Sequence, residues 1–146
     1  MNKLVIFDWM GTLYERNKGP FPESRQVLHE LGRKGYSLAL ISLSKDQTGR
    51  RREIDRSGLA NSFDIIIIDK EKTEVQYMGC IKRACSNPAH TVIVDDRTVR
   101  GIQIGNKLGC KTYWIQNGEY AHELPNAVTG HPTRTIKSVS ELPHYL

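Results

Sequence analysis

Five short apolar runs, each followed by a segment with helical character, constrain the fold of this chain more than any other feature. Polar and apolar residues do not alternate through the centres of these runs, which is typical of strands that are buried on both faces. Such strands, separated by helices, form a parallel sheet that is covered on both sides. The five runs are Lys3–Asp8, Tyr36–Ser42, Phe63–Ile68, Thr91–Val94 and Lys111–Ile115.

Start and stop signals place helices between these runs, at residues 22–35, 45–58, 74–85 and 98–108. The stretch from Asn117 to Thr133 is rich in Gly, Pro, His and Asn and is expected to be a loop. A short strand at Arg134–Ile136 and a last helical turn at Val139–Leu142 follow it. We therefore predict an α/β fold: a single Rossmann-like domain over residues 1–146, with a central parallel sheet of about five strands and helices on both faces.

Composition excludes several classes of protein. The chain is 38% hydrophobic and 25% charged, with no apolar stretch as long as a membrane span and no N-terminal signal pattern, so we expect a globular protein without a membrane partner. Cys80, Cys85 and Cys110 form neither a CxxC pair nor an even framework, and no His or Cys lies at metal-ligand spacing from them. Reduced thiols in a cytoplasmic protein are the expectation.

Polar residues follow four of the apolar runs at the points where the strands should end. They are Asp8, Ser42, the segment Asp69–Lys72, and the pair Asp95-Asp96. The carboxyl ends of parallel strands meet at one edge of a sheet, and sites of α/β proteins form there. The chain contains neither GxGxxG nor GxxxxGK[ST], so this edge has no dinucleotide or nucleotide-loop signature.

Carboxylates at such strand ends need a cation or hydrogen-bond donors. Asp8 follows core residues, and Asp95 and Asp96 repel each other, so a Mg²⁺ ion with oxygen ligands would satisfy all three. The alternative is that Asp96 caps the following helix or pairs with Arg97 or Arg100.

Two lysines compete for the end of the third strand. Thr73-Glu74-Val75-Gln76 fits a capping box, which makes Thr73 the N-cap of the next helix. Lys72 then lies just before the positive end of that helix, where an anion is also attracted, whereas Lys70 lies further back in the loop. We therefore expect Lys72 to belong to the site.

The motifs resemble those of the haloacid dehalogenase superfamily of aspartate-dependent phosphotransferases, over nearly the whole chain. The first motif of the family, DxDGT, corresponds to Asp8–Thr12 in FDWMGT. ALIS, ending at Ser42, corresponds to the second motif, Lys72 to the third, and VIVDD to the fourth. LANSFDIII and GNKLGCKTYWIQNG are also similar to connecting segments of the family.

The resemblance implies a role for each matching residue. Asp8 would be the nucleophile that accepts a phosphoryl group, while Ser42 and Lys72 would hold the phosphate oxygens. Mg²⁺ would be bound by Asp8, by the backbone carbonyl of Met10 and by Asp96, with Asp95 close by or ligating through water. Thr12 would brace the loop. A metal and a lysine would screen the repulsion between carboxylate and phosphate.

Two residues depart from the family pattern. Phosphatases of this superfamily generally have Asp at the position of Met10, where it protonates the leaving oxygen and later activates water, and Met does neither. Arg100 stands where many members have Asn or Asp to anchor a metal-bound water. His90, His122 and His131 are chemically able to replace the missing acid, although we favour an ordinary exposed or loop position for each of them.

The gaps between motifs leave no room for a cap domain. Between Asp8 and Ser42 there is space for a flap (Tyr14–Phe21) and one helix, and between Ser42 and Lys72 for one helix and one strand. In this family an open site suits large phosphorylated partners, or small ones when a neighbouring subunit of an oligomer covers the pocket. Nucleic-acid binding through Arg50–Arg52 is an alternative that we do not favour over a solvated helix face.

We therefore expect a capless Mg²⁺-dependent phosphatase that works through an aspartyl-phosphate on Asp8 and is weakened by Met10. The first alternative is a non-catalytic relative that binds a phosphorylated ligand or partner. The second is a hydrolase of the dehalogenase type, which the acid pair Asp95-Asp96 and the missing cap disfavour.

Overall fold

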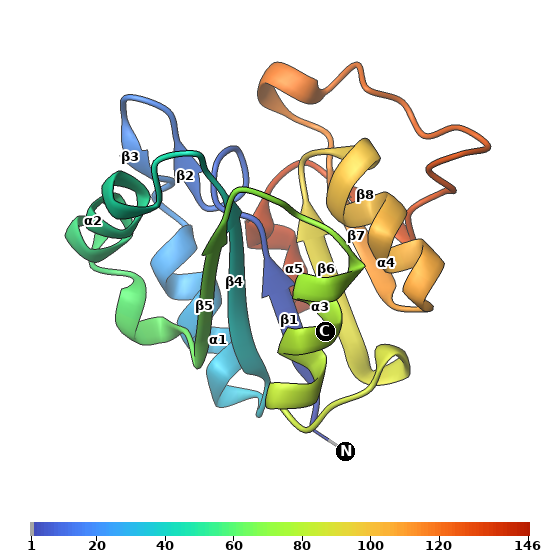
Figure 1. The fold of residues 1–146 in the computed structure, drawn as a ribbon, viewed down its shortest axis with the longest axis horizontal. Helices are drawn as coiled ribbons and strands as arrows, with labels where there is room; N and C mark the ends of the chain where they lie inside the picture. Colours follow the sequence, from blue (N-terminus) through green and yellow to red (C-terminus); the bar gives the residue numbers. More distant parts are fainter. Residues whose placement is uncertain (1) are drawn as a thin grey trace.

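Within residues 2–146, which the computed structural model describes, six parallel strands form one central sheet. Their spatial order is β5-β4-β1-β6-β7-β8, so β1 is central and the chain builds first to one side of it and then to the other (Figure 1). The strands are β1 (Leu4–Phe7), β4 (Ser37–Leu43), β5 (Ile65–Asp69), β6 (Thr91–Asp95), β7 (Lys111–Ile115) and β8 (Arg134–Ile136). The predicted single parallel α/β domain is confirmed, and the short segment at Arg134–Ile136 is its sixth strand.

Helices cover both faces of this sheet. They are α1 (Ser24–Arg33), α2 (Gln47–Ser57), α3 (Glu74–Arg83), α4 (Gln103–Leu108) and α5 (Leu142–Tyr145). Alternate residues of β1 point to opposite faces, as the pleat of a strand requires. Val5 and Phe7 pack in the core formed with α1, α2 and α5, whereas Leu4 and Ile6 pack in the core formed with α3 and α4. A two-sided core of this kind explains why the strands are continuously apolar.

Short turns complete the chain between these elements. The 3₁₀ turns are η1 (Ala60–Ser62), η2 (Pro88–His90), η4 (Gly118–Tyr120) and η5 (Val139–Glu141). The helix expected at 98–108 is divided: a π-helical turn, η3 (Thr98–Ile102), precedes α4. The reason is local, because the N–H of Gly101 donates to Asp95 Oδ2 at 3.0 Å rather than continuing an α-helical ladder. Turns of this type are frequent at functional sites.

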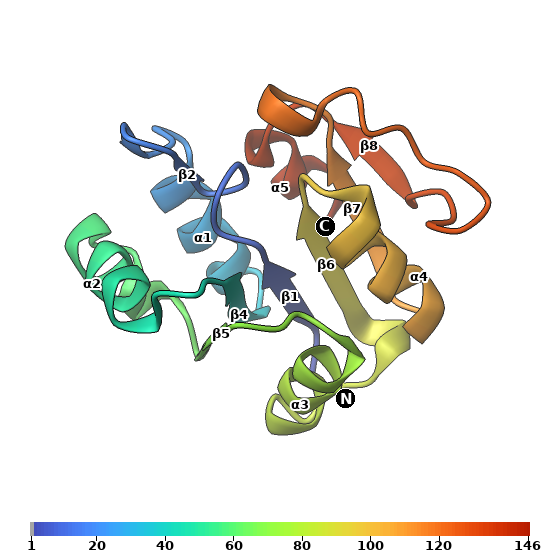
Figure 2. The ribbon, with the colours of Figure 1, turned by 45° about the horizontal axis from the view of Figure 1, so that its top comes forward.

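The described residues contain no cap domain, as the sequence predicted. The connection from β1 to α1 holds only a small antiparallel hairpin, β2 (Tyr14–Glu15) and β3 (Gly19–Pro20), and the connection from β4 to β5 holds α2 and η1. Figure 2, which brings the carboxyl ends of the strands forward, shows the hairpin, α2 and the long loop after β7 around that edge.

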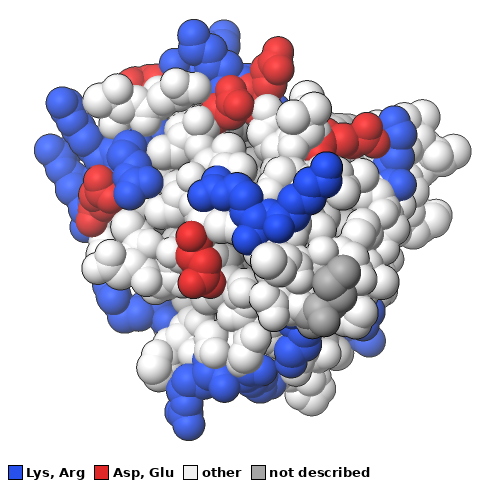
Figure 3. Space-filling model, turned by 60° about the horizontal axis from the view of Figure 1, so that its bottom comes forward, with Lys and Arg blue, Asp and Glu red and all other residues white. Residues whose placement is uncertain are grey.

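One face of the molecule shows how charge is distributed away from the sheet edge. On the face drawn in Figure 3, the basic side chains of the described residues form separate groups with acidic and uncharged ones between them, not one continuous basic stripe. Cys80, Cys85 and Cys110 are all free thiols. No helix in residues 2–146 combines the length and the apolar character needed to cross a membrane.

Candidate active site

The residues predicted from strand ends do meet at the carboxyl edge of the sheet. Phe7 of β1 is paired with Val94 of β6, so Asp8 and Asp95 are adjacent at the ends of neighbouring strands. The N–H of Asp8 donates to the carbonyl of Val94 at 3.0 Å, which fixes Asp8 against β6. Carboxylate oxygens of Asp8, Asp95 and Asp96 lie within 4.8 Å of one another.

Lys72 is the cation that joins two of these carboxylates. Its Nζ lies 2.9 Å from Asp8 Oδ1 and 3.2 Å from Asp95 Oδ2, and only 2% of its side chain is exposed. Burial by itself lowers the pKa of Lys72, but the charges of Asp8 and Asp95 outweigh it and hold the pKa well above the ordinary value. Lys70 is exposed, so Lys72 is the lysine that the structure places at the site.

The capping box that favoured Lys72 is confirmed. Thr73 is the N-cap of α3: its hydroxyl accepts from the N–H of Val75, and the side chain of Gln76 accepts from the N–H of Thr73. The start of α3 is thereby fixed two residues after Lys72, and the lysine is directed under the ends of β1 and β6.

Asp95 is held from several sides. Its carboxylate accepts from the backbone N–H groups of Arg97 and Gly101, at 3.0 Å each, in addition to the contact with Lys72. A Cβ at position 101 would overlap Asp95 Oδ2, so this approach requires glycine. Asp95 thus acts partly as the cap of the following turn, the role that the sequence had left open for Asp96.

Asp96 has a different environment, with few donors. Its side chain is packed against Gly11, where a Cβ would overlap the carboxylate, and 4% of the residue is exposed. Burial, followed by the negative charges of Asp8 and Asp95, raises the pKa of Asp96 to about 10. Burial and the charge of Asp8 also raise the pKa of Asp95, against the opposing effect of Lys72.

These carboxylates fit a divalent cation. Three carboxylates, of which Asp95 and Asp96 are buried, share one lysine, so the side chains of the protein do not compensate three negative charges. Oxygen ligands of this kind are those that Mg²⁺ prefers. The carbonyl of Met10 accepts no hydrogen bond within residues 2–146, so it is available as a further oxygen ligand. Arg97 pairs with Glu123 rather than with Asp96, at 3.0 Å, which disfavours the ion-pair alternative.

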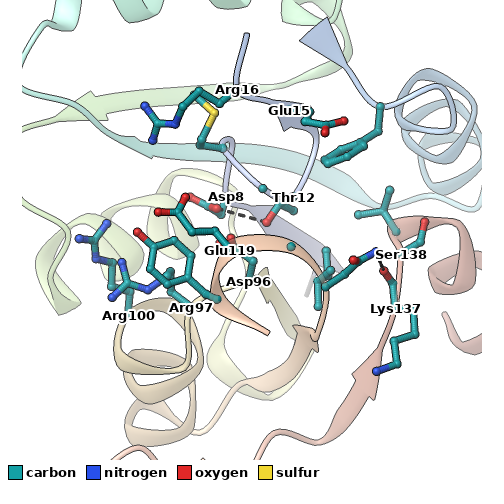
Figure 4. A pocket seen from close by; sticks show the side chains of 18 of the residues that line it. Asp8, Thr12, Glu15, Arg16, Asp96, Arg97, Arg100, Glu119, Lys137 and Ser138 are labelled. Atoms are coloured by element: carbon teal, nitrogen blue, oxygen red, sulfur yellow. Dashed lines mark hydrogen bonds between the residues drawn. The ribbon is translucent and has the colours of Figure 1, made fainter. Parts of the chain in front are cut away.

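The side chains of the loop after Asp8 make different contacts from one another. Thr12 is buried, and its hydroxyl donates to Asp8 Oδ2 at 3.2 Å (Figure 4). Trp9 is buried against Tyr14, and its Nε1 donates to Glu53 Oε1 at 2.8 Å. Met10 is partly buried against the core and also lines the cavity above Asp8. Position 10 therefore carries no carboxyl group, unlike the corresponding position of the motif DxDGT.

A cavity of about 600 Å³ opens above Asp8, Met10 and Asp96. The hairpin contributes Glu15 and Arg16 to its walls, and η3 contributes Arg100. Further lining residues come from the loop after β7 and from the segment after β8, among them Glu119, Lys137 and Ser138 (Figure 4). Tyr120 lines the cavity as well. Charged groups of both signs surround the opening.

Neither of the two predicted phosphate ligands, Ser42 and Lys72, lines this cavity. Lys72 lies beneath it, and Ser42 is 1% exposed, with its Oγ accepting from Arg50 Nη1 at 2.6 Å. Arg50 itself lines the cavity. Of the basic residues Arg50–Arg52, only Arg50 therefore lines the cavity. Arg51 pairs with Asp55 on the exposed side of α2, and Arg52 is also exposed.

Sequence reasoning missed a clamp that fixes the outer wall. Glu123 accepts from Arg97 Nε, from the hydroxyl of Thr98 and from the N–H of Val99, and Arg97 stacks over the ring of Tyr120 at 3.8 Å. Burial by itself raises the pKa of Glu123, but these donors and the charge of Arg97 lower it by a larger amount, so the pKa lies below its ordinary value. Glu123 and Tyr120 belong to a loop without periodicity, and no sequence signal indicates their role.

The three histidines considered as proton donors lie away from the cavity walls. His90 is hydrogen-bonded to Asn87 before β6, at the opposite end of that strand from the site. Neither His122 nor His131 is among the described residues that line the cavity. The cavity carboxyl groups outside the aspartate cluster are those of Glu15, Glu23 and Glu119.

Solved structures with the same fold include enzymes of more than one activity. A 2-haloacid dehalogenase from Pseudomonas syringae superposes with a TM-score of 0.80 at 14% identity, covering 99% of this chain and 97% of that one. A D,D-heptose 1,7-bisphosphate phosphatase from B. bronchiseptica, complexed with magnesium and phosphate, gives 0.78 at 16%, covering 97% and 96%. A HAD phosphatase from Thermococcus onnurineus gives 0.71 at 20%, covering 86% of this chain and 57% of that one. At these identities the likeness establishes the fold alone.

Comparison of the sequence itself gives a family. Curated protein sequences provided no match. The family model described as haloacid dehalogenase-like hydrolase matches residues 3–115, which include the strand ends, the carboxylate cluster and Lys72. Since this match spans well over half of the chain, the protein belongs to the haloacid dehalogenase-like hydrolase family.

Proposed function

We propose that this protein is a Mg²⁺-dependent phosphatase that hydrolyses phosphoric monoesters through an aspartyl-phosphate on Asp8. The observation that carries the proposal is the position of the Asp8 carboxylate. It lies at the floor of the cavity, with one oxygen bonded to Thr12 and the other to Lys72, next to the buried acid Asp96.

The covalent route follows from the charges around Asp8. An oxygen of Asp8 would form a bond to phosphorus while the bond from phosphorus to the leaving oxygen breaks, and the leaving oxygen would take a proton. Water would then attack the same phosphorus and release inorganic phosphate and the Asp8 carboxylate. Lys72, whose Nζ lies 2.9 Å from Asp8 Oδ1, lowers the repulsion between carboxylate and phosphate. Bound Mg²⁺, held by Asp8, Asp96, the Met10 carbonyl and Asp95 directly or through water, would neutralise charge on the phosphoryl oxygens.

Met10 limits this route at its two proton transfers. Its side chain lines the cavity where a proton donor to the leaving oxygen would act, and thioether sulfur does not serve as a general acid. The first candidate therefore favours substrates whose leaving group needs little protonation, such as aryl and acyl phosphates. The same observation favours the second candidate, a non-catalytic protein that binds a phosphorylated ligand or partner.

The test is a phosphatase screen with and without Mg²⁺ on wild type and Asp8→Asn. We expect aryl phosphate turnover that requires Mg²⁺ and is lost in the variant. Phosphate binding without turnover would favour the non-catalytic candidate. Turnover of a haloacid that is unaffected by chelator would favour a dehalogenase, which the paired acids and the absence of a cap in residues 2–146 disfavour.

A further inference from the structure

The proposed site needs a side chain that contacts the phosphate oxygens from its open side. Lys72 and Ser42, the two residues assigned to this role from the sequence, are both covered and do not line the cavity. Arg50 of α2 does line it, together with Asp8 and Leu43, the last residue of β4. A fixed guanidinium therefore faces the same space as the nucleophile.

Arg50 is fixed by three contacts. Nη1 donates to Ser42 Oγ at 2.6 Å and to the carbonyl of Leu43 at 3.2 Å, and Nε lies 3.3 Å from Glu53 Oε1. Glu53 is held in turn by Trp9 Nε1 at 2.8 Å. Only 16% of the Arg50 side chain is exposed, so its long stem is not free to move.

One nitrogen of this guanidinium is left over. Nη2 makes no hydrogen bond or ion pair with the described residues. No buried side-chain nitrogen or oxygen of those residues lacks a hydrogen-bond partner, so Nη2 must be in contact with solvent. Because Arg50 lines the cavity, an oxyanion that enters it can be met by this N–H group without any loss of the contacts that hold the side chain.

We propose that Arg50 binds the phosphoryl group of the substrate and that Ser42 acts through Arg50 as a positioning residue. The inference rests on the proposed function for its ligand class, a phosphoryl dianion. Arginine suits this role because its planar donors match phosphate geometry and its charge does not depend on pH. The hydroxyl of Ser42 is then engaged in aiming the guanidinium, not in touching the phosphate.

The probe for this proposal is inorganic phosphate, with its binding measured by ³¹P NMR titration in the presence of Mg²⁺. Arg50→Gln should weaken phosphate binding about 10–100-fold, the range expected for a hydrogen bond between charged groups. Arg50→Lys keeps the charge but loses the planar donors and should weaken binding less. Arg52→Gln is the matched control, because it removes the same charge from an exposed position of the same helix.

A double-mutant cycle tests the part assigned to Ser42. Ser42→Ala should weaken phosphate binding several-fold in wild type and add nothing in the Arg50→Gln background. Additive effects would instead mean that Ser42 meets the phosphate directly. Melting temperatures are measured in parallel, and if Arg50→Gln does not fold, Arg50→Lys replaces it in the cycle.

The outcomes separate this inference from the proposed hydrolysis. If phosphate binding depends on Arg50 but no aryl phosphate is hydrolysed, the catalytic proposal fails and the binding role stands. If wild type hydrolyses aryl phosphate while Arg50→Gln matches Arg52→Gln in phosphate affinity and KM, the role of Arg50 is overturned and the hydrolysis stands. A wild type that binds no phosphate overturns the role of Arg50 outright.

Discussion

The site has two parts that are built differently. Its floor, Asp8, Thr12, Lys72, Asp95 and Asp96, consists of side chains at strand ends or beside them, each covered or bonded to another floor residue. Its outer wall, formed by the hairpin at 14–20, Arg100 of η3 and the loop at 117–123, carries exposed or half-buried charged groups. Under the proposed function, the floor would determine the reaction and the wall would determine which molecule undergoes it.

The largest effect should come from the floor. Asp8→Asn keeps the shape of the side chain but removes the nucleophile, so turnover of aryl phosphate should fall on the order of 10⁴–10⁶-fold, as loss of a catalytic nucleophile does elsewhere. Intact mass spectrometry should show a phosphorylated species in wild type and none in the variant. Phosphorylation of Asp8→Asn would assign the covalent step to another residue.

Met10 stands between floor and wall, and replacing it should have the next largest effect. General acid–base help is worth roughly 10²–10⁴-fold, so Met10→Asp should raise the turnover of alkyl phosphates by about that factor. It should also shorten the life of the phosphorylated Asp8, since water attack gains a base. Time-resolved intact mass and phosphate release measure the two steps separately.

A contrary outcome for Met10 would point to the wall. If wild type already hydrolyses alkyl phosphates briskly and Met10→Asp changes nothing, another group donates the proton. Glu119 is then the residue to replace by Gln. Glu15 is paired with Lys18 and Glu23 accepts from Ser138, whereas Glu119 is exposed, makes no hydrogen bond within residues 2–146 and points toward Asp8 in the view of Figure 4.

The acidic residues of the floor should also make the free energy of unfolding depend on pH. Because the folded-state pKa of Asp96 is raised to about 10, the folded protein retains a proton that the unfolded chain releases above pH 4. In chelator, the free energy of unfolding should therefore fall as pH rises from 5 to 9, lowering the melting temperature on the order of 5 °C. Saturating Mg²⁺ should reverse much of this loss.

Asp96→Asn is the matching variant for that titration. Without metal at pH 8 it should be more stable than wild type, because the ionisation of Asp96 on unfolding favours the unfolded chain at that pH and Asn cannot ionise. Part of the pH dependence should persist, since the pKa of Asp95 is raised as well. A melting temperature of wild type in chelator that does not change between pH 5 and 9 would contradict the uncompensated charge of the cluster.

Most of the fold and of the floor could be predicted because both follow from local patterns. Apolar runs with polar residues at their ends place Asp8, Asp95 and Asp96 at one edge, and the capping box at Thr73 distinguishes Lys72 from Lys70. These signals need no knowledge of contacts between distant residues. The family resemblance added roles to residues that the pattern had already brought together.

The rest depended on contacts that no local pattern encodes. Ser42 lies at a strand end as predicted, but the side chain of Arg50 covers it from the next helix, eight residues later in the chain. The clamp of Glu123 on Arg97 and Thr98 joins a loop to a π-turn about 25 residues away. The one extra residue that distinguishes a π-turn from an α-helical turn is hard to detect in a single sequence. Packing between elements decided which charged groups face the cavity.

The smallest effects should come from charged residues of the outer wall, and exposed arginines of α2 provide the comparison. Arg100 lines the cavity and makes no ion pair within the described residues, whereas Arg51 and Arg52 lie outside the cavity on α2. Arg100→Gln should lower kcat/KM for a large phosphorylated substrate about 2–5-fold, the range of exposed charge pairs, and most strongly at low salt. The Arg51→Gln, Arg52→Gln double variant should match wild type at every ionic strength. Equal effects of both variants would show that overall charge, not the wall, attracts the substrate, and the division between floor and wall would then lose its meaning for specificity.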